Sequence, residues 1–235
     1  MPQLTAIAIL AVLYAAAVLR VRRRRGIVHV RRVVSFAAGI ALLVVAVTIA
    51  DETFARHMAQ HLLIGDLAPL LLVLGLNGPL LRPVLAFRPV RALRVLSHPL
   101  VALPLWAIDL CAWHVTPLFR AAVEHEGVHA VQHLLFFTCG ALLWSALLEL
   151  LPGPRWFRTP QRLGYLGVMW LVSLVLSQVF LWSSHPYYYA SLSDQRAGGG
   201  IMLVEGTAVM LAVLVWLLWC ALVPSADRGA AAVRS

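Results

Sequence analysis

Long apolar runs alternate with short polar segments along the whole chain. Seven of them come close to the ~20 helical residues that cross the hydrocarbon core of a membrane. They lie at about 4–20, 33–51, 58–77, 99–114, 129–151, 163–183 and 199–223. The fourth run is the weakest, because it is short and contains Pro99 and Pro104. Backbone N–H and C=O groups in lipid must bond to one another, so each run is predicted to be a helix.

Composition places the chain among integral membrane proteins. Hydrophobic residues make up 61% of its 235 residues, charged residues make up 12%, and the mean hydropathy is +0.85. A soluble domain of this size does not need so much apolar surface. We therefore predict an all-α integral membrane protein: one seven-transmembrane-helix bundle over residues 1–223, followed by a disordered cytoplasmic tail at 224–235.

The arginines predict the orientation of this bundle. The chain has 19 arginines and no lysine, and positive charge collects in the cytoplasmic loops of membrane proteins. Alternate loops and the tail carry Arg20, Arg22, Arg23, Arg24, Arg25, Arg31, Arg32, Arg82, Arg88, Arg91, Arg94, Arg155, Arg158, Arg162, Arg228 and Arg234. The other side carries only Arg56, Arg120 and Arg196. The N-terminus is thus expected outside and the C-terminus in the cytoplasm, and the net charge of +9 reflects topology, with no nucleic acid binding.

Histidines with helical spacing stand at the outer ends of two predicted helices. His57 and His61 open the third run, while His125, His129 and His133 lead into the fifth. Side chains four residues apart lie on one face of a helix, so each group presents its rings together. His114 and His185 close two further runs on the same side. The pattern predicts that these groups meet at the outer membrane surface.

The residue types favour a transition-metal ion as the shared ligand. Neutral imidazole is the commonest metal ligand and suits copper or zinc, while sulfur ligands favour Cu(I). The expected ligands are His57, His61, His129 and His133, with weaker candidates His125, His114, His185, Met58 and Met202. The three cysteines lie far apart inside apolar runs, so no disulfide framework is expected.

Acidic residues inside the predicted helices form a second group. Asp66, Asp109 and Glu205 lie at membrane depth, where ionisable side chains are costly and face the bundle interior. On an α-helix Asp66 is about 140° around the axis from His61. We expect these carboxyls, together with that of Asp194, to support the site or to join helices by hydrogen bonds, and not to bind the metal.

Three segments resemble the signatures of a known family. They are His57-Met58-Ala59-Gln60-His61-Leu62-Leu63 with Pro69-Leu70 and Gly75; His129-Ala130-Val131-Gln132-His133-Leu134-Leu135-Phe136-Phe137 with Gly140; and Ser193-Asp194-Gln195-Arg196-Ala197-Gly198-Gly199-Gly200-Ile201-Met202. In order and spacing over about 50–223 they resemble the multi-spanning CtaG family of bacterial cytochrome c oxidase assembly factors. This family is distinct from the single-span copper chaperone that shares its name.

The resemblance implies a metallochaperone and not an enzyme. Such a protein would lie in the bacterial plasma (inner) membrane and deliver or insert copper into the catalytic subunit of cytochrome c oxidase. It would receive copper from a periplasmic donor. The resemblance implies His57, His61, His129 and His133 as the metal-handling residues, and it places Asp194 and Met202 in the third signature.

Two other functions fit the residue pattern. An intramembrane zinc-dependent hydrolase needs about three protein ligands, an open coordination position and a base. A haem electron carrier needs two histidines on different helices at equal depth. The residues leave both open beside copper delivery.

Overall fold

A computed structural model describes residues 2–49, 52–86, 93–188 and 191–222, and all regular secondary structure within them is helical. The elements are α1 (Pro2–Arg23), α2 (Val30–Thr48), α3 (Phe54–Leu62), the π-helical segment η1 (Leu63–Leu67), α4 (Ala68–Gly75), α5 (Gly78–Ala86), the 3₁₀ turn η2 (Leu93–Val95), α7 (Pro99–Trp113), α8 (Thr116–Glu124), α9 (Glu126–Leu147), α10 (Thr159–Trp182) and α11 (Leu192–Leu222). The predicted tail at 224–235 lies outside the described residues.

The predicted helices are present in the described part of the chain. Six spans are long and apolar enough to cross a membrane: α1, α2, the continuous run Phe54–Gly75, α9, α10 and α11. The weak fourth run forms α7, whose 15 residues reach only ~22 Å at the α-helical rise. It continues into α8 after a bend of 72°, and the pair counts as a seventh span if taken as one. The short run with two prolines is therefore the one that falls short of a membrane.

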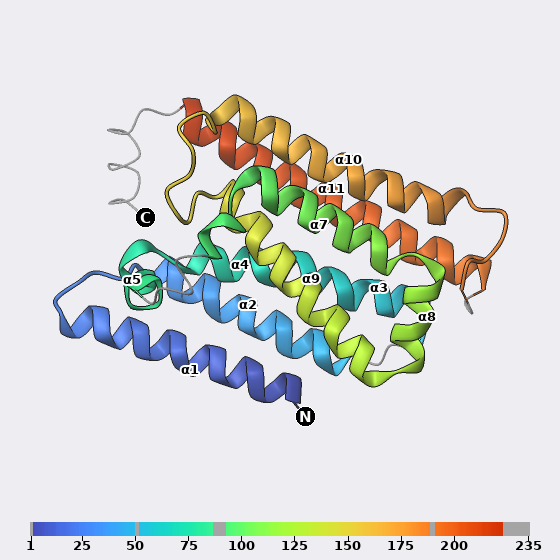
Figure 1. The fold of residues 1–235 in the computed structure, drawn as a ribbon, viewed down its shortest axis with the longest axis horizontal. Helices are drawn as coiled ribbons and strands as arrows, with labels where there is room; N and C mark the ends of the chain where they lie inside the picture. The colour runs from blue at the N-terminus through green and yellow to red at the C-terminus, as the bar shows by residue number, and fades with distance from the viewer. Residues whose placement is uncertain (1, 50–51, 87–92, 189–190, 223–235) are drawn as a thin grey trace.

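Successive long spans run in opposite directions, so the connections between them alternate between the two ends of the bundle (Figure 1). The α1–α2 connection with Arg24 and Arg25 lies at one end. The α2–α3 connection and the α8–α9 junction lie at the other, and both histidine pairs follow these connections. The arginine-bearing and histidine-bearing ends are thus opposite, as the alternation requires. Which end faces the cytoplasm stays a prediction from the arginines.

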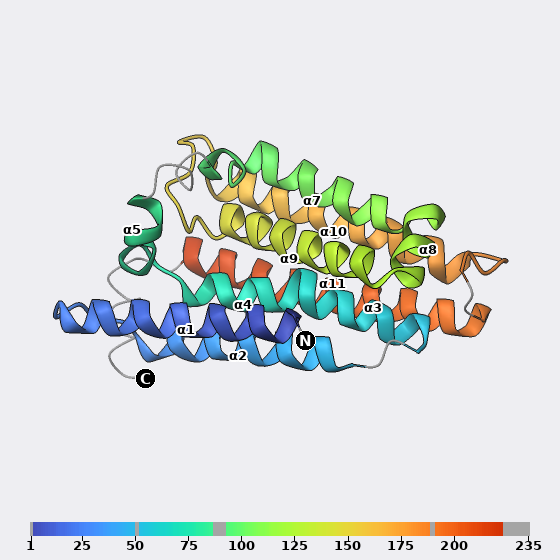
Figure 2. The same cartoon turned by 60° about the horizontal axis from the view of Figure 1, so that its bottom comes forward.

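Apolar side chains both fill and cover the bundle. Trp144, Leu143 and Leu166 are almost fully buried in a cluster that joins α9, α10 and α11. A second cluster joins α1, α2 and α4, which lie side by side in Figure 2. Many large apolar side chains, such as Val204 and Ile108, are exposed on the outer surface. A helix that is apolar all round is suited to a lipid environment.

The run Phe54–Gly75 changes its helical pitch midway. It is α-helical in α3, π-helical in η1 and α-helical again in α4. Pro69 lies in the first turn of α4. It has no N–H to donate to the carbonyl of Gly65, four residues earlier. The wider π turn accommodates this missing bond without breaking the run.

The closest backbone crossing in this region joins η1 to α9. A Cβ atom placed on Gly140 would lie 1.9 Å from the carbonyl oxygen of Gly65, so only glycine fits there. Gly65 itself lies against Phe136 of α9. This contact holds the third and fifth predicted spans together just below their histidines.

Candidate metal centre

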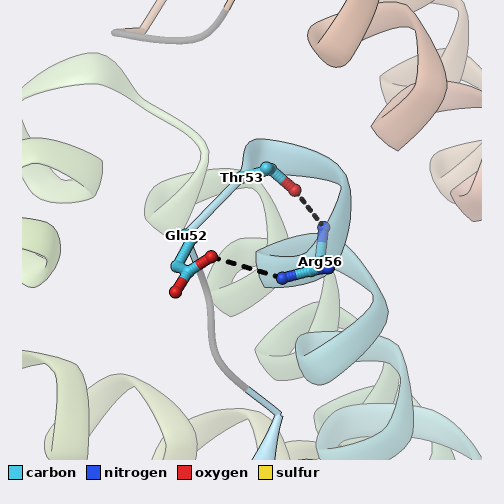
Figure 3. Close-up of polar contacts among 3 residues, drawn as sticks. All are labelled: Glu52, Thr53 and Arg56. Carbon is cyan, nitrogen blue, oxygen red and sulfur yellow. Dashed lines mark hydrogen bonds and ion pairs between the residues drawn. The ribbon is translucent and has the colours of Figure 1, made fainter.

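Helix α3 begins at a capped turn. Thr53 is the N-cap, and its hydroxyl accepts a hydrogen bond of 3.3 Å from the N–H of Arg56 (Figure 3). The Arg56 guanidinium also pairs with the exposed carboxylate of Glu52 at 3.4 Å. Such a cap satisfies one of the N–H groups left open at a helix start. It sets the position from which His57 and His61 project.

Asp194 of α11 provides a second cap for the same helix. Its two carboxylate oxygens accept hydrogen bonds from the N–H groups of Phe54, at 2.7 Å, and Ala55, at 3.1 Å. A carboxylate at a helix N-terminus is also favoured by the helix dipole. Asp194 therefore fixes α3, and with it the first histidine pair, to the last helix of the bundle.

Four imidazoles from two helices form one cluster. Ring centroids are 4.1 Å apart for His57 and His61 on α3, and 4.2 Å apart for His129 and His133 on α9. Across the helices they are 5.2 Å apart for His57 and His129, and 5.4 Å apart for His61 and His133. One ring nitrogen from each of His57, His61 and His129 lies within 4.8 Å of the others. The two histidine pairs meet in space, and we call these four residues the outer histidine set.

The environment of this set fits a metal ion. His57, His61 and His133 are 3%, 6% and 6% exposed, and His129 is half-buried. Within the described residues, neither ring nitrogen of His61 has a hydrogen-bond partner. A buried polar atom left without a partner costs free energy. A cation held between the rings would satisfy the nitrogen lone pairs.

The first helix reaches the same cluster through Gln3. Its side-chain amide lies 3.2 Å from Nδ1 of His133. A hydrogen bond on one ring nitrogen fixes the tautomer and orients the other nitrogen toward a ligand. Gln3 was not among the expected site residues. The only signal for it is a polar residue at the outer end of an otherwise apolar run.

An open cavity of about 410 Å³ leads to the outer histidine set. His57 and His129 form part of its wall, and the carboxylates of Glu52 and Asp194 line it as well. Acidic side chains around an opening raise the local concentration of cations. The cavity thus provides an entry path for a positively charged ligand.

The weaker ligand candidates lie elsewhere. His125 is the exposed N-cap of α9, and His185 is exposed in the connection between α10 and α11. His114, Met58 and Met202 line a separate, smaller cavity deeper in the bundle. The candidates expected to form one ligand set are therefore divided among the outer histidine set, the smaller cavity and the exposed surface.

The buried carboxyls contact indole groups. The Nε1–H of Trp144 donates to Asp66 at 2.8 Å, and the Nε1–H of Trp113 donates to Asp109 at 2.9 Å. The Glu205 carboxyl lies against that of Asp66. The Trp144–Asp66 bond joins α9 to η1, as expected for polar groups in a membrane. The Trp113–Asp109 bond lies within α7.

Asp66 nevertheless shares a cavity with His61. The expected angle of about 140° between them assumed α-helical geometry, and η1 is π-helical at this point. The extra residue in the π turn changes the direction in which Asp66 projects.

The geometry and the sequence signatures agree with a known family. The sequence pattern described as cytochrome c oxidase caa3 assembly factor matches residues 12–222. The chain belongs to this family. The match includes both histidine pairs, Asp194 and the glycines of the close crossing.

Curated mycobacterial proteins that are similar to the chain carry names that describe them as uncharacterised. An uncharacterised protein of Mycobacterium bovis is 29% identical over 251 residues, which is 90% of this chain and 37% of the relative. An uncharacterised protein of Mycobacterium leprae is 26% identical over 248 residues, which is 89% of this chain and again 37% of the relative. The chain thus spans just over a third of the length of these relatives. No solved structure matches the chain.

Proposed function

We propose that this assembly factor hands copper to the catalytic subunit of a cytochrome c oxidase while the oxidase is built. The observation that carries the proposal is the convergence of four imidazoles from α3 and α9 at one end of a membrane bundle. Membership of an oxidase assembly family supports the choice of recipient. Copper is the cargo, and the outer histidine set is where it binds before transfer.

The donor atoms suit a metal that must be released again. The outer histidine set offers neutral nitrogen ligands, which bind copper and zinc well. Thiolates, which bind Cu(I) more strongly, are absent from the set. A carrier of this kind selects its ion by ligand type and gives it up to a site with more or better ligands.

The position of the set suits exchange with proteins outside the bilayer. The predicted orientation puts the histidine end at the outer surface, where a periplasmic copper donor would meet the 410 Å³ cavity. Neighbouring rings of the outer histidine set have centroids 4.1 to 6.1 Å apart. This spacing favours a single ion over a haem, whose macrocycle would have to fit between two of the rings.

The test compares two double variants of the purified protein. His61→Ala with His133→Ala removes one imidazole from each pair, while His125→Ala with His185→Ala removes two exposed histidines outside the set. We expect the first variant to lose most of the bound copper and the second to keep it. Equal copper content in wild type and the His61/His133 variant would contradict the proposal, as would retention of zinc in preference to copper.

The same variants test the recipient in cells. Without the chain, the oxidase catalytic subunit is expected to accumulate with less copper, as measured by metal analysis of the purified oxidase. The His125/His185 variant should restore the copper and the His61/His133 variant should not. Copper-replete oxidase in cells lacking the chain would contradict the assembly role.

A further inference from the structure

A second, smaller cavity lies next to the outer histidine set. It has a volume of about 50 Å³, enough for a water molecule or a single ion. Its wall includes His61, His114, Met58, Met202 and Asp66. His61 is thus shared: its ring contacts His57 and His133 on one side and borders this cavity on the other.

His114 presents a buried lone pair at this cavity. Its Nδ1 lies 2.7 Å from the carbonyl oxygen of Leu110, which only accepts hydrogen bonds. Nδ1 must therefore carry the proton, and in the neutral ring the lone pair is on Nε2. Nε2 is buried and has no hydrogen-bond partner within the described residues. Metal-binding imidazoles commonly donate one ring N–H to a carbonyl oxygen and use the lone pair of the other nitrogen for the metal. His114 has this arrangement.

The backbone of His114 is held in place from outside the membrane span. The hydroxyl of Tyr188, in the connection between α10 and α11, donates to the His114 carbonyl oxygen at 2.5 Å. Burial raises the pKa of Tyr188 above its ordinary value, and the neighbouring Tyr187 raises it further. The phenol therefore keeps its proton and stays a donor, so the His114 ring is positioned from both ends of the residue.

Two methionines complete a soft set of donors. Met58 on α3 and Met202 on α11 are 1% and 4% exposed and belong to one buried cluster. Thioether sulfur is a soft ligand that favours Cu(I) over zinc. The remaining members of this cluster within the described residues are aromatic or aliphatic, so the only soft donors there are the two sulfurs.

A cation here would also find opposite charge nearby. Asp66 lines the cavity, and the Glu205 carboxyl lies against Asp66. A buried ion is costly unless a partner of opposite charge lowers its desolvation cost. Two neighbouring carboxyls do not both ionise, so Asp66 and Glu205 together provide one negative charge inside the bundle.

We propose that His114, Met58 and Met202 form a second, inner Cu(I) site, connected to the outer histidine set through His61. The inference rests on the proposed function, because it takes copper to be the cargo. Copper entering at the outer set would move to the inner position by exchanging nitrogen ligands for sulfur ligands, with His61 bound in both. Because Met58 and Met202 are buried, the inner site would limit the contact of the ion with water and its oxidation before transfer.

Selenium labelling tests this site separately from the outer one. Protein produced with selenomethionine is loaded with Cu(I), and X-ray absorption at the copper edge reports the neighbours of copper. We expect selenium neighbours in the wild type, because Met58 and Met202 are ligands. The cysteines cannot contribute this signal. Met58→Leu with Met202→Leu should abolish it, while Met169→Leu, which alters a buried methionine in a different cluster, should leave it unchanged.

The outcomes separate the two sites. Copper with nitrogen neighbours and no selenium in the wild type would overturn the inner site and leave the outer one standing. Selenium neighbours that persist in His129→Ala with His133→Ala, together with fewer nitrogen neighbours, would support two positions. A His114→Leu variant should lose selenium scattering as well, and unchanged scattering there would overturn the assignment of His114. Wild-type protein that retains no copper would overturn both sites.

Discussion

At the scale of single residues, the site depends on side chains that position the histidines as well as on the histidines. Asp194 is the clearest case, since it accepts hydrogen bonds from two N–H groups at the start of α3. Its carboxylate comes from a helix 140 residues further along the chain. The cap therefore ties α3, which carries the first histidine pair, to α11, and it explains how an acidic residue in the last signature positions a histidine pair in the first.

Removing this cap should loosen the histidine pair. Asp194→Ala is expected to lower the stability of the protein by about 0.5–2 kcal/mol, the usual cost of losing an N-cap. The stability of Asp194→Asn should lie between that of Asp194→Ala and that of the wild type, because an amide has one acceptor oxygen and a carboxylate has two. Thermal unfolding in detergent measures both. The neighbouring exposed Ser193→Ala is the control, and equal unfolding temperatures for Ser193→Ala and Asp194→Ala would contradict the capping role.

Residue spacing predicted part of this site. Spacing of four along a helix placed His57 with His61 and His129 with His133, and the four rings do meet. Spacing gave no means of placing His114, Met58 and Met202 in a separate cavity, because that depends on how α7 and α11 pack against α3. Gln3 was not predicted as a site residue for the same reason, because its contact with His133 joins residues 130 positions apart.

At the scale of helices, two glycines and a proline decide how the histidine-bearing spans cross. Pro69 lacks a backbone N–H, and the π-helical segment η1 accommodates the missing hydrogen bond. The Gly65 carbonyl oxygen lies against Gly140 of α9. Apolar length predicted where the helices lie, since it depends only on composition. The π turn lies within a continuous apolar run, so composition gave no sign of it or of the cavity that Asp66 and His61 both line.

The crossing predicts a strong and local effect of one methyl group. Gly140→Ala would put a Cβ atom 1.9 Å from the Gly65 carbonyl oxygen, and overpacking of this kind costs about 1–3 kcal/mol. Copper binding should weaken as well, because the two histidine pairs would be pushed apart. Gly164→Ala on α10 is the matched control, as nothing lies within 4 Å of its added Cβ atom.

The control variant should be as stable as the wild type or more so, since alanine favours a helix by up to about 1 kcal/mol over glycine. Thermal unfolding and copper titration of the two variants give the comparison. Indistinguishable results for Gly140→Ala and Gly164→Ala would show that the spans do not approach each other at this glycine.

At the scale of the whole molecule, the alternation of helix direction separates an arginine end from a histidine end (Figure 1). The arginines predict that the histidine end faces outward. Copper delivery as proposed requires this orientation, because a periplasmic donor reaches only the outer end. The fold alone is compatible with either direction across the bilayer.

Labelling of introduced cysteines determines the orientation. In a chain whose three native cysteines are replaced by alanine, Ser184→Cys at the histidine end should react with a membrane-impermeant maleimide in intact cells. Gly153→Cys at the arginine end should react only after the cells are opened. Ser184 and Gly153 are both exposed in connections between helices, so access of the maleimide depends on the side of the membrane. The reverse labelling pattern would contradict the proposed route of copper.

The central claim is that copper binds between α3 and α9 at the outer histidine set. Anomalous diffraction from crystals of the copper-loaded protein, measured on both sides of the copper absorption edge, tests this claim most directly. We expect an anomalous peak among His57, His61 and His129, each of which has a ring nitrogen within 4.8 Å of those of the other two. No copper peak there, or a peak only at His125, His185 or another surface residue, would contradict it.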